Sequence, residues 1–145
     1  MMEPCHEDNL PKADGFTGKK ILVVDDNELV CEMIAKILMK YLGLEVIKVK
    51  GGNQTITAAL TGRYNGAIID LAMQGTSSSK IIRTIRTMLP EFPILAMYSR
   101  PNEEQVATLT QNEVTRVIQK PFKMTTLIDE ITEILGTDKI ISVQS

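Results

Sequence analysis

The sequence predicts an α/β fold in which five parallel strands form one sheet with helices on both faces. Five short apolar runs alternate along the chain with five stretches that have the apolar spacing of amphipathic helices. The short runs are apolar nearly throughout, which is typical of parallel strands covered on both sides. A chain of 145 residues, 43% hydrophobic and 23% charged, is suited to one globular domain.

The first half of the chain contains two strand patterns and two helix patterns. Residues 21–24 form a buried-strand pattern, and residues 28–42 carry apolar side chains at three- and four-residue spacing, which predicts a helix. Gly43 is expected to end this helix, because glycine adopts the left-handed backbone that closes many helices. A second strand is predicted over residues 45–49 and a short helix over residues 54–60.

The second half repeats this alternation. A third strand covers residues 67–69 and ends on Asp70, and a fourth covers residues 94–97. Asn102 is the expected N-cap of the following helix. The other elements are a helix with Ile81, Ile82, Ile85 and Leu89, a fifth strand at Val117 and Ile118, and a last helix with Leu127, Ile128, Ile131 and Leu135.

The chain divides into three segments. Residues 1–18 are polar, contain two prolines and two glycines, and show no hydrophobic period, which predicts a flexible leader. Residues 19–136 form the predicted domain, and residues 137–145 form a short tail. No output domain follows the last predicted helix in this sequence, so we expect either a stand-alone protein or part of a longer one.

Charge and hydropathy argue against two classes of partner. The 16 basic and 18 acidic residues are interspersed and give a net charge of −2, so there is no basic stripe of the kind that binds nucleic acid. No apolar run approaches the roughly 20 residues that span a bilayer, and the polar start does not resemble a signal peptide. We therefore expect a cytoplasmic protein without direct nucleic-acid or membrane binding.

Charged residues follow three of the predicted strands where each strand ends. Asp25 and Asp26 follow the first strand, Asp70 ends the third, and Lys120 follows the fifth. Because ligands of open parallel sheets bind beyond the carboxyl ends of the strands, we expect these side chains to meet there. Three carboxylates require a counter-ion, and Mg²⁺ prefers such oxygen ligands. The pattern indicates phosphoryl transfer, with Asp70 as nucleophile and Lys120 as the fixed positive charge.

Taken singly, each of these residues has an ordinary structural explanation. Aspartates are common in turns, and Asp25 and Asp26 could serve only as acids near the start of the next helix. A lysine at a strand end often points into water. The meeting of three strand ends favours a functional site over these explanations.

The motifs ILVVDDNELV, AIIDLAM and IQKPFKMTTL resemble those of the receiver domains of two-component response regulators, particularly the chemotaxis-type single-domain receivers. The resemblance runs from about residue 19 to residue 135, with the motifs in the family's order. It implies a flavodoxin-like, doubly wound sheet with strand order 2-1-3-4-5 and five helices.

The resemblance also implies a role for each matching residue. Asp25 and Asp26 correspond to the metal-binding acidic pair, with Asp26 the more direct ligand and Asp25 acting partly through water. Asp70 corresponds to the phosphoacceptor, which is itself a metal ligand, and Lys120 to the lysine that contacts the phosphoryl group. The backbone carbonyl of Ala72 corresponds to a further ligand of Mg²⁺.

Three departures from the family pattern concern the switch that follows phosphorylation. The fourth strand usually ends with Thr or Ser, whereas Tyr98 occupies that place and Ser99 comes one residue later. In the family, the residue three positions before the conserved lysine is usually aromatic; here that residue is Val117. Since successive strand residues face opposite sides, Ser99 replaces the missing hydroxyl only if the strand end bends. The bond from Lys120 to Pro121 is expected to be cis, as in the family.

The loop after the phosphoacceptor departs as well. Gln74 replaces a common proline, and residues 76–79, Thr-Ser-Ser-Ser, replace a stretch that usually contains glycine. We expect the serines to cap the following helix.

The leading hypothesis is a signalling receiver, not an enzyme, that accepts a phosphoryl group on Asp70 from a sensor histidine kinase or phosphotransfer protein with Mg²⁺. It would then bind a downstream protein in a phosphorylation-dependent way. One alternative is a pseudo-receiver that binds partners without phosphate, motivated by Tyr98 and Val117. Another is a phosphate-ester hydrolase, which is disfavoured because such enzymes place the nucleophile after the first strand.

The last helix raises the question of a dimer. It carries Ile131, Ile134 and Leu135, which we expect to pack in the core rather than form a dimer face. The sequence does not distinguish a monomer from a homodimer.

Overall fold

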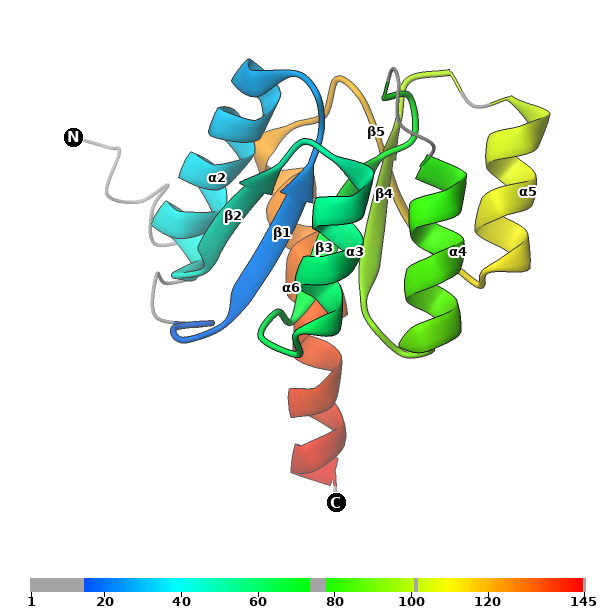
Figure 1. The fold of residues 1–145 in the computed structure, drawn as a ribbon. Helices are drawn as coiled ribbons and strands as arrows, with labels where there is room; N and C mark the ends of the chain where they lie inside the picture. The colour runs from blue at the N-terminus through cyan, green and yellow to red at the C-terminus, as the bar shows by residue number, and fades with distance from the viewer. Residues whose placement is uncertain (1–14, 74–77, 101, 145) are drawn as a thin grey trace.

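A computed structural model describes residues 15–73, 78–100 and 102–144 of the chain. Within these residues, five strands alternate with five helices (Figure 1). The strands are β1 (Lys20–Val24), β2 (Glu45–Val49), β3 (Gly66–Asp70), β4 (Ile94–Tyr98) and β5 (Arg116–Gln119). The helices are α2 (Glu28–Leu42), α3 (Gly52–Leu60), α4 (Ser78–Met88), α5 (Glu103–Gln111) and α6 (Met124–Gln144).

The strands form one parallel sheet in the order β2-β1-β3-β4-β5. This confirms the predicted α/β class, the parallel sheet and the doubly wound strand order. Helices α2 and α6 cover one face of the sheet, and α3, α4 and α5 cover the other (Figure 1). Among the described residues, no helix combines the length and apolar character needed to cross a bilayer.

Alternation along each strand builds two cores from one apolar run. In β1, Ile21 and Val23 pack towards α2 and α6, whereas Leu22 and Val24 pack towards the opposite layer. All four side chains are 0% exposed. The three central strands β1, β3 and β4 are therefore buried on both faces, which is the physical reason for their apolar sequences, whereas the edge strands β2 and β5 keep exposed charged or polar residues.

Helix α2 begins and ends as the sequence predicts. The side chain of Asn27 accepts hydrogen bonds from the backbone N–H groups of Leu29 and Val30. At the other end Gly43 adopts φ 72°, in the left-handed region, and its N–H donates to the carbonyl of Met39. The Asn27 cap fixes the start of α2 directly after the two aspartates that follow β1.

Several element ends differ from the sequence prediction. Phe16, which the sequence analysis places in the leader, is 8% exposed and belongs to the core under α2 and α6. Its N–H donates to the carbonyl of Leu42 over 2.9 Å. A single aromatic residue among polar neighbours has no period to reveal it. Helix α6 continues to Gln144 instead of ending near residue 136, and residues 1–14 lie outside the described part.

The apolar residues of α6 face the core, as the sequence predicts. Ile131 and Leu135 are buried against the sheet, and Ile134 is partly buried at the edge of the same cluster.

Because Phe16 closes the end of this core, Phe16→Ala should lower the free energy of unfolding by about 3 kcal/mol. Phe16→Leu, which keeps most of the apolar volume, should lower it by less than about 1.5 kcal/mol. Urea titrations followed by circular dichroism measure both variants. Equal stability of Phe16→Ala and wild type would show that this residue does not belong to the core in solution.

Candidate functional site

The candidate site lies at the carboxyl edge of the sheet, where β1, β3 and β5 end. Asp25 directly follows β1, Asp70 is the last residue of β3, and Lys120 directly follows β5. Ligand atoms of Asp25, Asp26 and Asp70 all lie within 4.8 Å of one another. The structure thus brings the three predicted carboxylates into one cluster.

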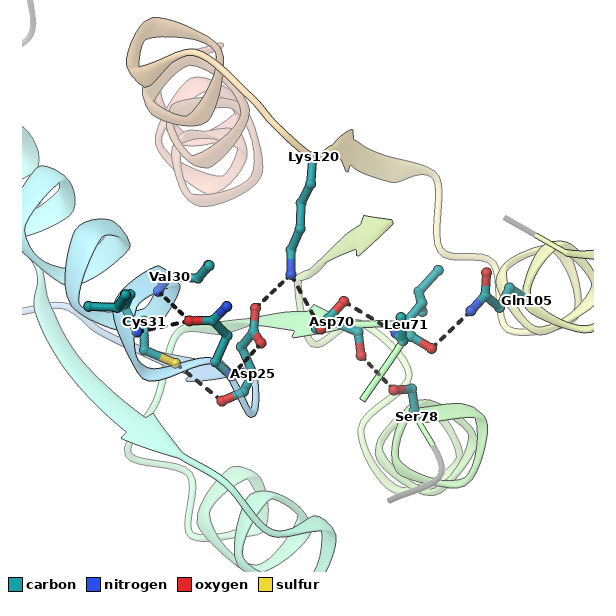
Figure 2. A network of polar contacts seen from close by, with 11 residues as sticks. Asp25, Val30, Cys31, Asp70, Leu71, Ser78, Gln105 and Lys120 are labelled. Carbon is teal, nitrogen blue, oxygen red and sulfur yellow. Dashed lines mark hydrogen bonds and ion pairs between the residues drawn. The ribbon is translucent and has the colours of Figure 1, made fainter. Parts of the chain in front are cut away.

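Lys120 lies between the two more buried carboxylates. Its Nζ is 2.8 Å from Oδ2 of Asp25 and 3.3 Å from Oδ2 of Asp70 (Figure 2). Asp25 is 0% exposed and Asp70 is 4% exposed, whereas Asp26 is exposed. The cluster therefore has a buried side, where one lysine partly offsets the charge of two carboxylates, and an open side at Asp26.

Burial and charge act in opposite directions on the titration of these groups. Burial raises the pKa of Asp70, as does the neighbouring charge of Asp25, while the N–H of Ala72 and the Lys120 ammonium oppose the rise. Burial alone would lower the pKa of Lys120, but its hydrogen bond to Asp25 and the attraction of Asp70 raise it above the ordinary value. Lys120 is consequently held in its charged form beside the acids.

Backbone N–H groups orient the two buried carboxylates. The N–H of Asn27 donates to Oδ1 of Asp25 over 2.9 Å, and the N–H of Ala72 donates to Oδ1 of Asp70 over 3.2 Å. In each case the donor is two residues beyond the aspartate, which is the local turn geometry that aspartate favours. The loops after β1 and β3 therefore hold both side chains towards Lys120.

Two side chains from the helical layer hold the loop after β3. The hydroxyl of Ser78, in the first turn of α4, donates to the carbonyl of Asp70 over 2.5 Å. The side-chain amide of Gln105, in α5, donates to the carbonyl of Leu71 over 3.0 Å (Figure 2). The end of the β3 strand is thereby tied to two helices.

These two contacts correct or extend the sequence analysis. Serines 77–79 are expected only to cap α4, yet the hydroxyl of Ser78 bonds to β3 and that of Ser79 lies 2.7 Å from the hydroxyl of Thr108 in α5. The position of Gln105, three residues after Asn102, is a capping-box signal, but the sequence does not indicate its contact with Leu71. Gln74, Thr76 and Ser77 lie outside the described residues.

Of the residues predicted to form the switch, Tyr98 ends β4, Ser99 follows it, and Val117 is the second residue of β5. Tyr98 and Val117 are partly buried in the core beneath α3, α4 and α5. Ser99 is exposed in a bend directly after β4, and it lines the same groove of about 530 Å³ as Lys120. The backbone therefore bends at Ser99. The bond from Lys120 to Pro121 is cis, as predicted.

The sheet order and the lysine-bridged acidic cluster define a doubly wound α/β domain with a charged site at its carboxyl edge. A family profile, the response regulator receiver domain, matches residues 21–132. The chain belongs to this family of two-component signalling domains.

Individual relatives are distant. Transcription factor SKN7 of Candida albicans is 26% identical over 102 residues, covering 70% of this chain and 18% of that protein. Regulatory protein VanRB of Enterococcus faecalis is 26% identical over 116 residues, covering 80% of this chain and 52% of the relative. The chain thus spans about half or less of the length of these two proteins.

Solved structures support the fold. Chemotaxis protein CheY4 of Vibrio cholerae superposes with a TM-score of 0.73 at 24% identity, covering 81% of this chain and 98% of that structure.

The raised pKa of Asp70 has a consequence for stability without metal. Because the folded state disfavours the charged form, Asp70→Asn should raise the melting temperature at pH 7 in EDTA. Lys120 keeps Asp25 as its partner, so no buried charge is left unpaired. The gain should shrink towards pH 4, near the unfolded aspartate pKa of about 3.9, because folded wild type takes up the proton.

Exposed Asp129 of α6 provides the matched control. Asp129→Asn should change the free energy of unfolding by less than about 0.5 kcal/mol at either pH. Calorimetry of the three proteins tests the account, and a destabilised Asp70→Asn at pH 7 would contradict it.

Proposed function

We propose that this domain accepts a phosphoryl group on Asp70 from a histidine kinase or a phosphotransfer protein, with Mg²⁺ bound by the acidic cluster. The observation that carries the proposal is the approach of Lys120 to Asp70 within a group of three clustered carboxylates. Membership in the receiver family and the matched motifs support it.

The reaction requires an oxygen of Asp70 to attack phosphorus in line with the leaving group. An oxygen–phosphorus bond forms on Asp70, while the bond from phosphorus to the donor histidine nitrogen breaks and the nitrogen keeps the electron pair. Lys120, already 3.3 Å from Oδ2 of Asp70, is positioned to pair with the phosphoryl oxygens. The protein contributes chiefly positioning and charge.

The residues at this edge fit Mg²⁺. Two nearly buried carboxylates share one ammonium and have an exposed third carboxylate beside them, which leaves excess negative charge among hard oxygen ligands. Asp25 is 0% exposed and its closer contact to Lys120, at 2.8 Å, leaves it less open to a metal ion, whereas Asp26 is exposed. We assign Asp26 and the phosphoacceptor Asp70 as direct ligands, with the Ala72 carbonyl as a third, by the matched family motifs. When bound, Mg²⁺ supplies charge neutralisation for the phosphoryl oxygens.

Incubation with acetyl phosphate and Mg²⁺ should add one phosphoryl group to the wild-type mass, because the acidic cluster supplies both nucleophile and metal site. Asp70→Asn should remove the added mass, as should EDTA, and Asp26→Asn should require at least about tenfold more Mg²⁺. Intact-mass spectrometry measures these gains, with Asp129→Asn as the control that labels normally. Undiminished labelling of Asp70→Asn would refute the assignment.

A pseudo-receiver that binds partners without phosphate is the second candidate, and Tyr98 and Val117 are the residues that favour it. The two candidates differ in their response to beryllofluoride, which mimics a phosphoryl group on an aspartate. A working receiver should show amide chemical-shift changes that extend from the site into β4, α5 and β5. Changes confined to the loops around Asp70, or none, would favour the pseudo-receiver.

A further inference from the structure

We propose that Gln105 is a positioning residue for Asp70 and that it links the loop after β3 to the start of α5. This rests on the proposed function in one respect, the assignment of Asp70 as phosphoacceptor. The proposal is based on one peptide group, which is hydrogen-bonded to both Gln105 and Asp70.

That peptide group joins Leu71 to Ala72. Its carbonyl accepts a hydrogen bond from Nε2 of Gln105 over 3.0 Å, and its N–H donates to Oδ1 of Asp70 over 3.2 Å. A peptide group is planar, with the carbonyl and the N–H pointing in opposite directions. By holding the carbonyl, Gln105 therefore sets the direction of the N–H that holds Asp70.

The other end of the Gln105 amide is also occupied. Its Oε1 accepts from the N–H of Asn102 over 3.2 Å, and the N–H of Gln105 donates to Oδ1 of Asn102 over 2.8 Å. This is the capping box at the start of α5. Only one orientation of the amide satisfies both partners, because Asn102 offers a donor and Leu71 an acceptor.

The surroundings strengthen the link. Leu71 is 7% exposed and Gln105 is partly buried, so water competes less for these hydrogen bonds than it would on an open surface. The role assigned to Gln105 is indirect, through the Leu71–Ala72 peptide.

Phosphorylation changes the acceptor at the end of this chain of bonds. A carboxylate oxygen is a stronger acceptor than the carbonyl oxygen of an acyl phosphate, so the hold of Asp70 on the Ala72 N–H weakens when the phosphoryl group is attached. A change in the orientation of the Leu71–Ala72 peptide then alters its hydrogen bond to Gln105. Through Gln105 the change reaches the first turn of α5. This connection does not pass through Tyr98 or Val117, the two positions that depart from the family pattern.

The test separates the two ends of the Gln105 amide. Gln105→Glu keeps an acceptor for the Asn102 N–H but has no donor for Leu71 at neutral pH, and Glu is favourable at this place in a capping box. Gln105→Met removes the donor without adding charge. Asn102→Ala is the matched control, because it removes the side-chain cap and leaves the amide of Gln105 able to reach Leu71.

Two measurements are made on each variant. The first is the temperature coefficient and hydrogen exchange of the Ala72 amide in the unphosphorylated protein. The second is the rate of acetyl-phosphate labelling at saturating Mg²⁺, which removes any difference in metal affinity. Both Gln105 variants should expose the Ala72 amide and label about fivefold more slowly, the effect of one lost hydrogen bond. Asn102→Ala should melt at a lower temperature and label at the wild-type rate.

Wild-type behaviour of the Ala72 amide in both Gln105 variants would overturn the proposal. Equal slowing by Asn102→Ala would also overturn it, because the effect would then come from a weakened helix. A wild-type protein that takes no phosphoryl group would refute the proposed function instead, and the Ala72 amide would still decide whether Gln105 positions the peptide.

Discussion

The structure depends most on the ammonium of Lys120, which lies between two nearly buried carboxylates. At an effective dielectric constant of about 20, opposite unit charges about 3 Å apart attract by roughly 5 kcal/mol before desolvation is subtracted. Like charges repel on the same scale. Lys120 contacts both Asp25 and Asp70 and thereby offsets their repulsion at this sheet edge. The surrounding backbone N–H groups hold the carboxylates in the orientation that this contact requires.

Strand order explains why a lysine performs this role. Strands β1 and β3 are neighbours in the sheet, so their terminal aspartates are adjacent although 45 residues separate them in sequence. Strand β5 is separated from β3 by β4 (Figure 1). A cation that follows β5 needs a long side chain to reach Asp25 and Asp70 past β4, and lysine provides one. Asp26 lies on the exposed side of the cluster.

Local patterns predicted most of the fold and the composition of the site. The period of residues 28–42, Gly43 as its end and Asn102 as an N-cap are signals within one element, and each appears in the structure as predicted. Convergence of the aspartates and Lys120 followed from the parallel arrangement of the strands. The charge pattern at the strand ends is therefore a property that the sequence alone predicts.

The remaining features depend on contacts between distant segments. The N–H of Phe16 donates to the carbonyl of Leu42 at the end of α2, and no periodic pattern in the sequence marks Phe16 as a core residue. Gln105 could be recognised as a capping residue, but its second partner, Leu71, lies 34 positions away. Ser78 was expected to cap a helix and instead bonds to the carbonyl of Asp70, 8 positions earlier. Only the packed structure shows which distant partner a polar side chain takes.

The most direct test of the central claim is the position of the attached phosphoryl group. Borohydride reduces an acyl phosphate to an alcohol, so a phosphorylated aspartate becomes homoserine and can be located by peptide sequencing in a mass spectrometer. Wild-type protein treated with acetyl phosphate and Mg²⁺ should carry homoserine at position 70. Homoserine at position 25 or 26, or at no position, would contradict the account of this site.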